Sequence, residues 1–239
     1  MKPMHRSLSG LLIAIVTLPV FMSLLACLPV PVGDPEKSRI DPGLSGLWFM
    51  PGEAAIVFIE PFDERTWLIL MMEAEFDDEI CPEAETEGED GGGYDALINR
   101  LQEANEGCFS LGEIDEIYKA WRTKLGSHWF MTWEPVFGEG EGFEFETDFW
   151  FVFRIDDSNK NEVALSMVNA DYDGFDDPAI AEKLDELEEQ GLPYDPRALK
   201  RARVVVEKVI RRNADDDALY EDNELVLIRI LPEHYDLFE

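Results

Sequence analysis

The chain has 239 residues, of which 52 are acidic and 20 basic, and its net charge at pH 7 is −32. This charge argues against nucleic-acid binding, which depends on neutralising phosphates with Lys and Arg. Hydrophobic residues make up 46% of the sequence, which excludes a disordered acidic chain and is enough for one sizeable core. Such a negative field favours cations and basic partners as ligands, and the alternative, which we favour, is that the charge keeps the protein soluble.

The N-terminus combines a short basic head at Lys2 and Arg6 with an apolar run over residues 11–26. As a helix, this run would span about 24 Å, which is less than the hydrocarbon core of a bilayer. A basic head, a short apolar middle and a small residue at the end are typical of an export signal. We therefore predict a signal peptide over residues 1–26. The alternative, a buried N-terminal helix, is disfavoured because Pro19 would interrupt it.

The end of this segment, Leu24-Leu25-Ala26-Cys27, resembles the lipobox of bacterial lipoprotein precursors. The resemblance implies that Cys27 is diacylated on sulfur, that cleavage occurs before it, and that it becomes the first residue. Leu28 rather than Asp follows, which in lipoproteins of diderm bacteria implies transfer to the outer membrane. We thus expect a protein that is lipid-anchored at the periplasmic face of the outer membrane, since more than one buried acyl chain anchors stably.

Two cysteines remain if lipidation uses Cys27. In an oxidising compartment Cys81 and Cys108 could form a disulfide, and the alternative is two free thiols. Both lie in or beside a stretch that we interpret as an acidic insertion over residues 73–112. It contains a triple glycine and a segment with helical spacing at residues 94–104.

We expect a tether over residues 27–42, rich in proline and charge, and a single α+β domain over residues 43–239. Its predicted sheet is mainly antiparallel, of six to seven strands, and is either open or a partial barrel. Apolar runs bounded by turn residues predict the strands at residues 54–60, 66–72, 117–123, 128–133, 149–155, 163–168 and 224–231.

Two helices are predicted before the last strand. Asp177 and Asp195 each precede a proline, which is the pattern of an N-cap followed by the first helical position. The second helix could use its basic face to dock an acidic partner or lipid headgroups, or that face could neutralise the protein's own acidic loops. Its basic residues are Arg197, Lys200, Arg201, Arg203, Lys208, Arg211 and Arg212.

One metal-binding pattern occurs. Asn169, Asp171 and Asp173 alternate before Gly174, as in the first half of a calcium loop, but the twelfth position holds Ile180 instead of glutamate. The same residues also fit a polar turn between strand and helix. No nucleophile elbow or zinc pattern is present in the sequence, and we expect no catalytic activity and no cofactor other than this candidate Ca²⁺ site.

Near the start of the domain, Gly46-Leu47-Trp48 resembles the G-x-W of the first strand of lipocalins. That resemblance implies a ligand-carrying barrel, in which Trp67, Trp133 and Trp150 could line a cavity; the alternative, which we favour, is that they fill a core. The sequence thus leaves three hypotheses. The first, which we expect, is a non-catalytic binding or scaffold module with an envelope protein partner. The alternatives are a carrier of a small apolar ligand and a hydrolase without a recognisable motif.

Overall fold

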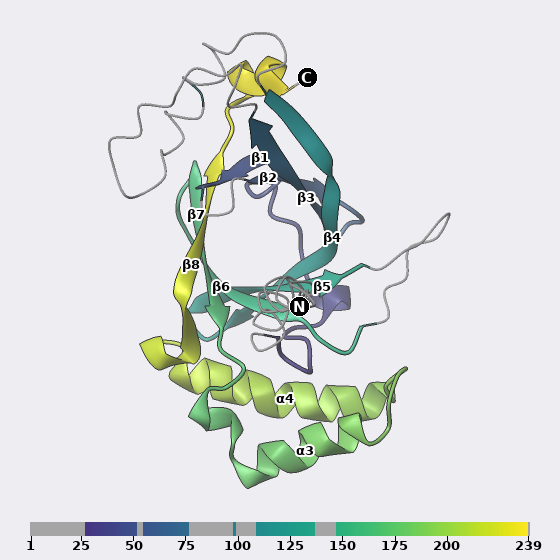
Figure 1. The fold of residues 1–239 in the computed structure, drawn as a ribbon. Coiled ribbons are helices and arrows are strands. Elements are labelled where there is room, and N and C mark those ends of the chain that lie inside the picture. The colour runs from purple at the N-terminus through teal and green to yellow at the C-terminus, as the bar shows by residue number, and fades with distance from the viewer. Residues whose placement is uncertain (1–26, 52–54, 77–97, 99–108, 137–146, 239) are drawn as a thin grey trace, which may run out of the picture.

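The computed structural model describes residues 27–51, 55–76, 98, 109–136 and 147–238. These residues form a closed barrel in which each of eight strands is antiparallel to its neighbours in the chain (Figure 1). The antiparallel sheet agrees with the sequence, but the number of strands is eight rather than six or seven, and the sheet closes. The strands are β1 (Gly46–Met50), β2 (Ala55–Pro61), β3 (Trp67–Phe76), β4 (Phe109–Leu125), β5 (His128–Pro135), β6 (Phe151–Asn159), β7 (Glu162–Val168) and β8 (Tyr220–Arg229).

Pairing between the first and last strands closes the barrel. Trp48 pairs with Arg229 and Phe49 with Ile228, while the other edge of β1 pairs with β2 along its whole length. Because closure leaves no free sheet edge, every strand has two partners. The strand that is absent from the seven predicted ones is β1. It is only 5 residues long, and its apolar residues are continuous instead of alternating.

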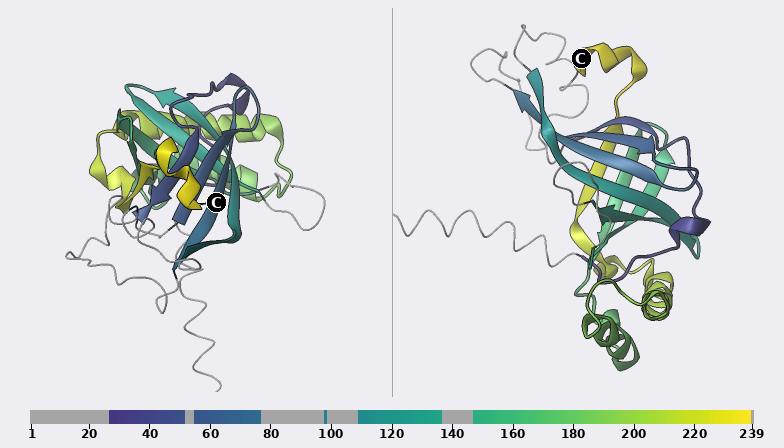
Figure 2. Two further views of the ribbon diagram at one scale, coloured as in Figure 1. Left: turned by 90° about the horizontal axis from the view of Figure 1, so that it is seen from above. Right: turned by 90° about the vertical axis from the view of Figure 1, so that its right-hand side faces the viewer.

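The two ends of the barrel differ. At one end, which we call the closed end, β2–β3, β4–β5 and β6–β7 are joined by tight turns at residues 62–66, 126–127 and 160–161. At the other, which we call the open end, β1, β3 and β5 finish and β2, β4 and β6 begin. Figure 2 shows the long strands β3 and β4 reaching beyond the others at the open end.

The two helices follow β7 and precede β8. In α3 (Pro178–Glu188), the Asp177 side chain accepts a hydrogen bond from the Ala179 N–H at 2.9 Å. In α4 (Pro196–Asn213), Asp195 accepts from the N–H groups of Arg197 at 2.8 Å and Ala198 at 3.0 Å. Both predicted helix starts are therefore confirmed. The short helices are 3₁₀ turns: η2 (Pro35–Lys37), η4 (Asp173–Phe175), η5 (Asp217–Leu219) and η6 (Pro232–Phe238).

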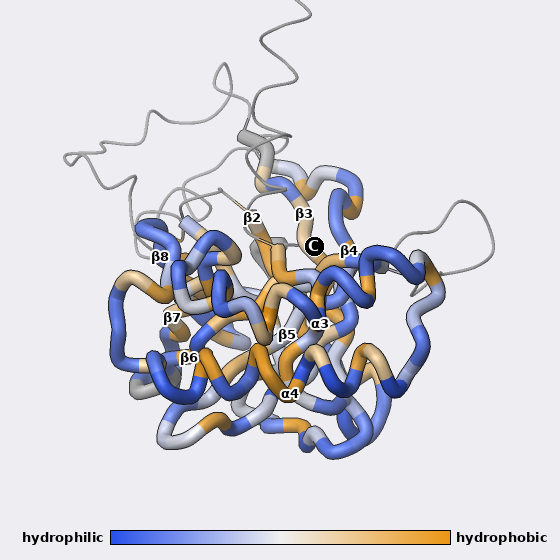
Figure 3. Tube along the Cα trace, turned by 90° about the horizontal axis from the view of Figure 1, so that it is seen from below, coloured by the Kyte–Doolittle hydropathy of each residue, from blue (hydrophilic) through white to orange (hydrophobic). Residues whose placement is uncertain are grey.

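The helices cover part of the outer face of the barrel. Apolar residues recur along α4 between hydrophilic ones (Figure 3), and Ala202, Val206 and Ile210 are buried in one cluster with Phe130 of β5 and Val152 of β6. The strands alternate, so their neighbours Met131 and Phe153 face the barrel interior instead. β5 and β6 are thus covered on both faces. No helix among the described residues is both long and apolar enough to cross a bilayer.

The segment after Cys27, expected as part of a tether, is packed between the barrel and α4. Leu28, Val30 and Val32 are buried in the same cluster as the helix. The Val32 carbonyl accepts hydrogen bonds from the Trp121 indole N–H at 2.9 Å and the Thr132 hydroxyl at 2.7 Å. Leu28, Val30 and Val32 alternate with prolines, and all three side chains are buried. The proline content alone had indicated an exposed tether.

The strands also extend into both edges of the segment expected as an acidic insertion. β3 continues to Phe76, β4 begins at Phe109, and these two residues pair with each other. The core of that segment, including Cys81 and Cys108 and all but one residue of the helix expected at 94–104, lies outside the described residues.

Candidate functional site

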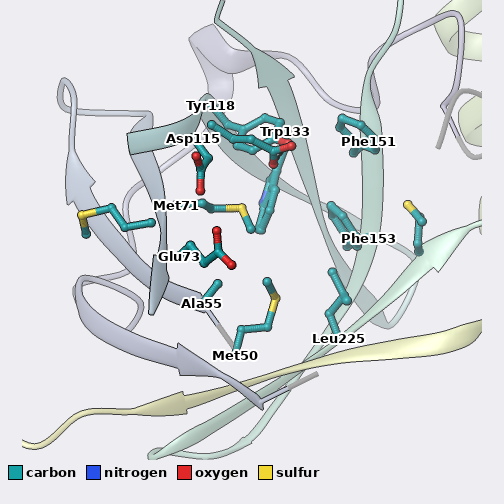
Figure 4. Close-up of a pocket in the computed structure, with 13 residues that line it drawn as sticks. Met50, Ala55, Met71, Glu73, Asp115, Tyr118, Trp133, Phe151, Phe153 and Leu225 are labelled. Atoms are coloured by element: carbon teal, nitrogen blue, oxygen red, sulfur yellow. Dashed lines mark hydrogen bonds between the residues drawn. The ribbon is translucent and has the colours of Figure 1, made fainter. Parts of the chain in front are cut away.

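A cavity of about 680 Å³ occupies the open end of the barrel (Figure 4). Its wall is apolar and comes from strands all around the barrel, while carboxylates of β3 and β4 stand at its mouth. The apolar wall includes Met50, Met71, Phe151, Phe153, Met167 and Leu225. A cavity of this size lies within the range of small-molecule sites, which are typically apolar with a few polar groups.

The rest of the interior is packed. Trp48 of β1, Trp67 and Ile69 of β3 and Leu165 of β7 are fully buried, and only about 10 Å³ of space remains among the side chains at this level. Large side chains therefore form the floor of the cavity. An eight-stranded barrel is just wide enough for such filling or for one small ligand, and this barrel is filled at one end and hollow at the other.

Aromatic rings make one side of the cavity. The centroid of Trp133 lies 5.2 Å from that of Tyr118 and 4.8 Å from that of Phe153, and Tyr118 meets Phe151 edge-on at 5.8 Å. These tilted and edge-on contacts are favourable ring arrangements, and they hold the four rings in place. The wall that a ligand would meet is therefore preformed by contacts within the protein.

Tyr118 joins this aromatic wall to the acidic mouth. Its hydroxyl donates a hydrogen bond to the Glu116 carboxylate two residues earlier on β4. Burial, followed by this hydrogen bond and the charge of Glu116, raises the pKa of Tyr118 above its usual range. The side chain consequently stays a neutral phenol with its proton directed at Glu116.

The three tryptophans proposed from the sequence to line a cavity occupy different places. Trp133 lines it. Trp67 points into the barrel at the level of the packed floor. Trp150 precedes β6, and its indole N–H donates to the Glu134 carboxylate at 3.2 Å, away from the cavity lining.

Cys27 lies near the open end. The next residue, Leu28, exchanges two backbone hydrogen bonds of 2.9 Å with Trp150, which immediately precedes the cavity residue Phe151. Burial raises the pKa of the Cys27 thiol to about 11. Cys27 is also close enough to Tyr118 for its charge to contribute to the raised pKa of that phenol.

The predicted calcium residues form a turn after β7. The Asn169 side chain accepts a hydrogen bond from the Asp171 N–H at 2.8 Å, and Asp173 begins η4. The intervening Tyr172 donates its hydroxyl to Asp216. Within the described ranges, no group of three or more His, Cys, Asp or Glu side chains is placed to hold a metal ion.

On α4, two of the basic residues contact the protein itself. The Arg203 guanidinium donates to the Gly33 carbonyl at 2.8 Å and lies 3.6 Å from Asp34. Arg201 lies 3.7 Å from Glu186 of α3. These contacts join Arg203 to the N-terminal segment and place Arg201 beside α3.

Sequence reasoning did not identify Glu73, Asp115 or Tyr118 as site residues. Glu73 lay inside the expected insertion, and Asp115 lay between that insertion and the strand predicted at residues 117–123. The available signal was the alternation of Glu116, Tyr118 and Ala120, which places three residues on one face of a strand.

The fold and the cavity together define an up-and-down antiparallel barrel of eight strands with a preformed internal cavity open at one end. No protein-family model, curated protein or solved structure matches the chain.

Proposed function

We propose that the protein binds a small, largely apolar ligand inside the barrel and is held at a membrane by lipid on Cys27. The observation that carries the ligand-binding half is the cavity of about 680 Å³ in a barrel that is otherwise tightly packed. Lipocalins use closed eight-stranded up-and-down barrels in this way, and Gly46-Leu47-Trp48 is the sequence feature that resembles them.

The lining supports an adaptable apolar site. Four methionines, including Met50, Met71 and Met167, contribute to it. Methionine side chains are unbranched and polarisable, so they adjust to ligands of different shape and make favourable contacts with aromatic rings. Among the sequence hypotheses, the cavity supports the carrier, and we prefer it to a scaffold or a hydrolase.

Anchoring at Cys27 fits this role geometrically. The packed segment from Leu28 to Val32 leaves little free chain between Cys27 and the barrel wall. Acyl chains on the Cys27 sulfur would therefore hold the open end close to the outer-membrane surface. A ligand that partitions into the bilayer would then have a short path to the cavity.

The ligand-binding proposal can be tested with N-phenyl-1-naphthylamine, a neutral apolar fluorophore. We expect saturable one-to-one binding by the wild-type protein. Leu225→Trp places a larger ring in the cavity and should abolish binding without unfolding the protein. Val204→Trp is the matched control, because Val204 is 55% exposed on α4 and far from the cavity lining.

Absence of binding to the wild type, or equal binding by Leu225→Trp, would overturn the proposal. Native mass spectrometry of the protein purified from its own cells gives a second measurement. A bound small molecule that is lost in Leu225→Trp and retained in Val204→Trp is the expected result.

A further inference from the structure

Carboxylates at the mouth of the cavity distinguish it from a simple apolar pocket. Glu73 comes from β3, and Asp115 and Glu116 come from β4. Met71 pairs with Glu116 but Met72 pairs with Ile114, so Asp115 is an extra residue in a β-bulge. Bulges redirect side chains at barrel rims, and this one brings two consecutive acidic residues to the lining of one cavity.

Glu73 and Asp115 have no cationic partner in the described structure. Figure 4 shows their carboxylates pointing toward the same space beside Met71. Glu116 accepts the Tyr118 hydroxyl, whereas neither Glu73 nor Asp115 takes part in a hydrogen bond or ion pair of its side chain among the described residues. Adjacent carboxylates without a counter-charge create a local negative potential that attracts a cation.

A second, independent feature lies deeper in the cavity. Trp133 is only 3% exposed, yet its indole N–H has no hydrogen-bond acceptor among the described residues. A buried donor without an acceptor is unfavourable, so a ligand oxygen placed there would be stabilised. The aromatic faces of Trp133 and Tyr118 beside it also favour a positive charge, because ring faces attract cations.

We infer that the ligand is a cationic amphiphile with an ammonium group at Glu73 and Asp115, an oxygen acceptor against the Trp133 indole N–H, and an apolar chain among the methionines and phenylalanines. This inference rests on the proposed ligand binding in the cavity and names the class of ligand. The opposite class, fatty-acid anions, should bind more weakly, because the same carboxylates repel an anionic head group.

The test compares three probes that share one alkyl chain and differ in the charge of the head group: decyltrimethylammonium, decanol and decanoate. Isothermal titration calorimetry of the full mature protein, below the micelle concentration of each probe, should rank them in that order of affinity. The double variant Glu73→Gln/Asp115→Asn should weaken decyltrimethylammonium binding by about tenfold and leave decanol binding unchanged. Added salt should weaken only the binding of the cation.

A matched control removes the same net charge elsewhere. Glu60 and Glu162 are exposed near the closed end, so Glu60→Gln/Glu162→Gln should keep the ranking of the probes and the affinity for the cation. Equal affinity for all three probes, or an equal loss in both double variants, would overturn the inference. If N-phenyl-1-naphthylamine still binds in that case, ligand binding in the cavity stands; if it does not, both proposals fail.

The role of Trp133 has a separate test. Decanoylcholine carries an ester oxygen that decyltrimethylammonium lacks. Trp133→Phe keeps an aromatic ring but removes the N–H donor, so it should weaken decanoylcholine binding more than decyltrimethylammonium binding. Equal effects on the two probes would show that the indole N–H does not bind the ligand.

Discussion

The guanidinium carbon of Arg229 lies 4.1 Å from the centroid of the Trp48 ring, so the last strand closes onto the first at the closed end of the barrel. Arg229 also donates to the Ser45 carbonyl at 3.0 Å and to that of Lys160 at 3.3 Å. The Trp48 indole N–H in turn donates to the Leu44 carbonyl at 2.9 Å. One arginine thus ties together three segments that are far apart in the sequence.

Replacing this arginine should destabilise the barrel without affecting the cavity. Arg229→Ala removes the cation–π contact and the hydrogen bonds to the carbonyls, and we expect a loss of about 2–3 kcal/mol in the free energy of unfolding. Urea unfolding followed by tryptophan fluorescence measures it. Arg229→Lys should lie between alanine and wild type, since lysine keeps the charge but cannot reach several carbonyls at once.

Because Arg229 and the cavity are at opposite ends, folded Arg229→Ala should bind N-phenyl-1-naphthylamine as the wild type does. Unchanged stability in Arg229→Ala would contradict the closing role of the arginine.

Gly46 permits this closure. Its φ of 132° lies in a region that L-residues rarely adopt, and a Cβ there would lie 3.0 Å from Arg229 Nη1. Gly46→Ala should therefore cost about 1–3 kcal/mol of stability through strain and displacement of the guanidinium. Gly191 also has a positive φ, of 66°, and no atom within 4 Å of its Cβ position, so Gly191→Ala measures the cost of a positive φ without a steric contact. Equal effects at both sites would mean that contact with Arg229 is unimportant.

Local sequence patterns were sufficient to predict most of the strands and both helices. The Asp-Pro pairs before α3 and α4 and the turns after β2, β4 and β6 depend on neighbouring residues, which a sequence displays directly. Barrel closure could not be predicted in this way, because the register of Trp48 with Arg229 joins residues that are far apart in the chain. The burial of the segment at Leu28 could not be predicted for the same reason, because its partners, Trp150 and α4, are far away in the chain.

The site was less predictable than the fold. Trp67, Trp133 and Trp150 are the same residue type in similar contexts, and only the height of each along the barrel decides which one meets the cavity. Asp115 reaches the mouth through a bulge, and a bulge changes the face of a residue without a clear mark in the sequence. Composition therefore indicated which types of side chain line the cavity. Which individual residues do so depends on the strand register.

If lipid anchors the protein, its presence in the membrane fraction depends on the Cys27 sulfur. Cys27→Ser removes the sulfur that would carry the acyl chains, so the protein should move from the membrane fraction to the soluble periplasmic fraction. Mass spectrometry of the wild-type N-terminal peptide should show a diacylated Cys27 as first residue. Retention of Cys27→Ser in membranes after a salt wash would contradict anchoring by lipid.

In a form that is not acylated, the Cys27 thiol should react slowly. Burial raises its pKa to about 11, and the thiolate is the reactive species. Alkylation by iodoacetamide at pH 8 should therefore be slow in the folded protein, increase as the pH approaches 11, and become fast in urea. Cys27→Ser identifies the share of the signal that belongs to this residue. Equal rates at pH 8 for folded and unfolded protein would contradict the burial of the thiol.

Glu134 should make stability depend on pH. Burial raises the pKa of its carboxyl, and this effect outweighs the hydrogen bond from Trp150 and the charge of Lys119, which lower the pKa. A folded-state pKa above the unfolded value means that the folded protein binds the proton more tightly. The contribution of Glu134 is therefore fully present below the unfolded pKa and is lost as the pH rises through the folded pKa.

Glu134→Gln removes this titration and keeps an acceptor for the Trp150 indole N–H. The stability of Glu134→Gln relative to the wild type should accordingly increase between pH 4 and pH 7, as measured by urea unfolding at each pH. Glu60→Gln, at an exposed position near the closed end, controls for the loss of one negative charge. A difference between Glu134→Gln and wild type that stays constant with pH would show that burial does not perturb this carboxyl.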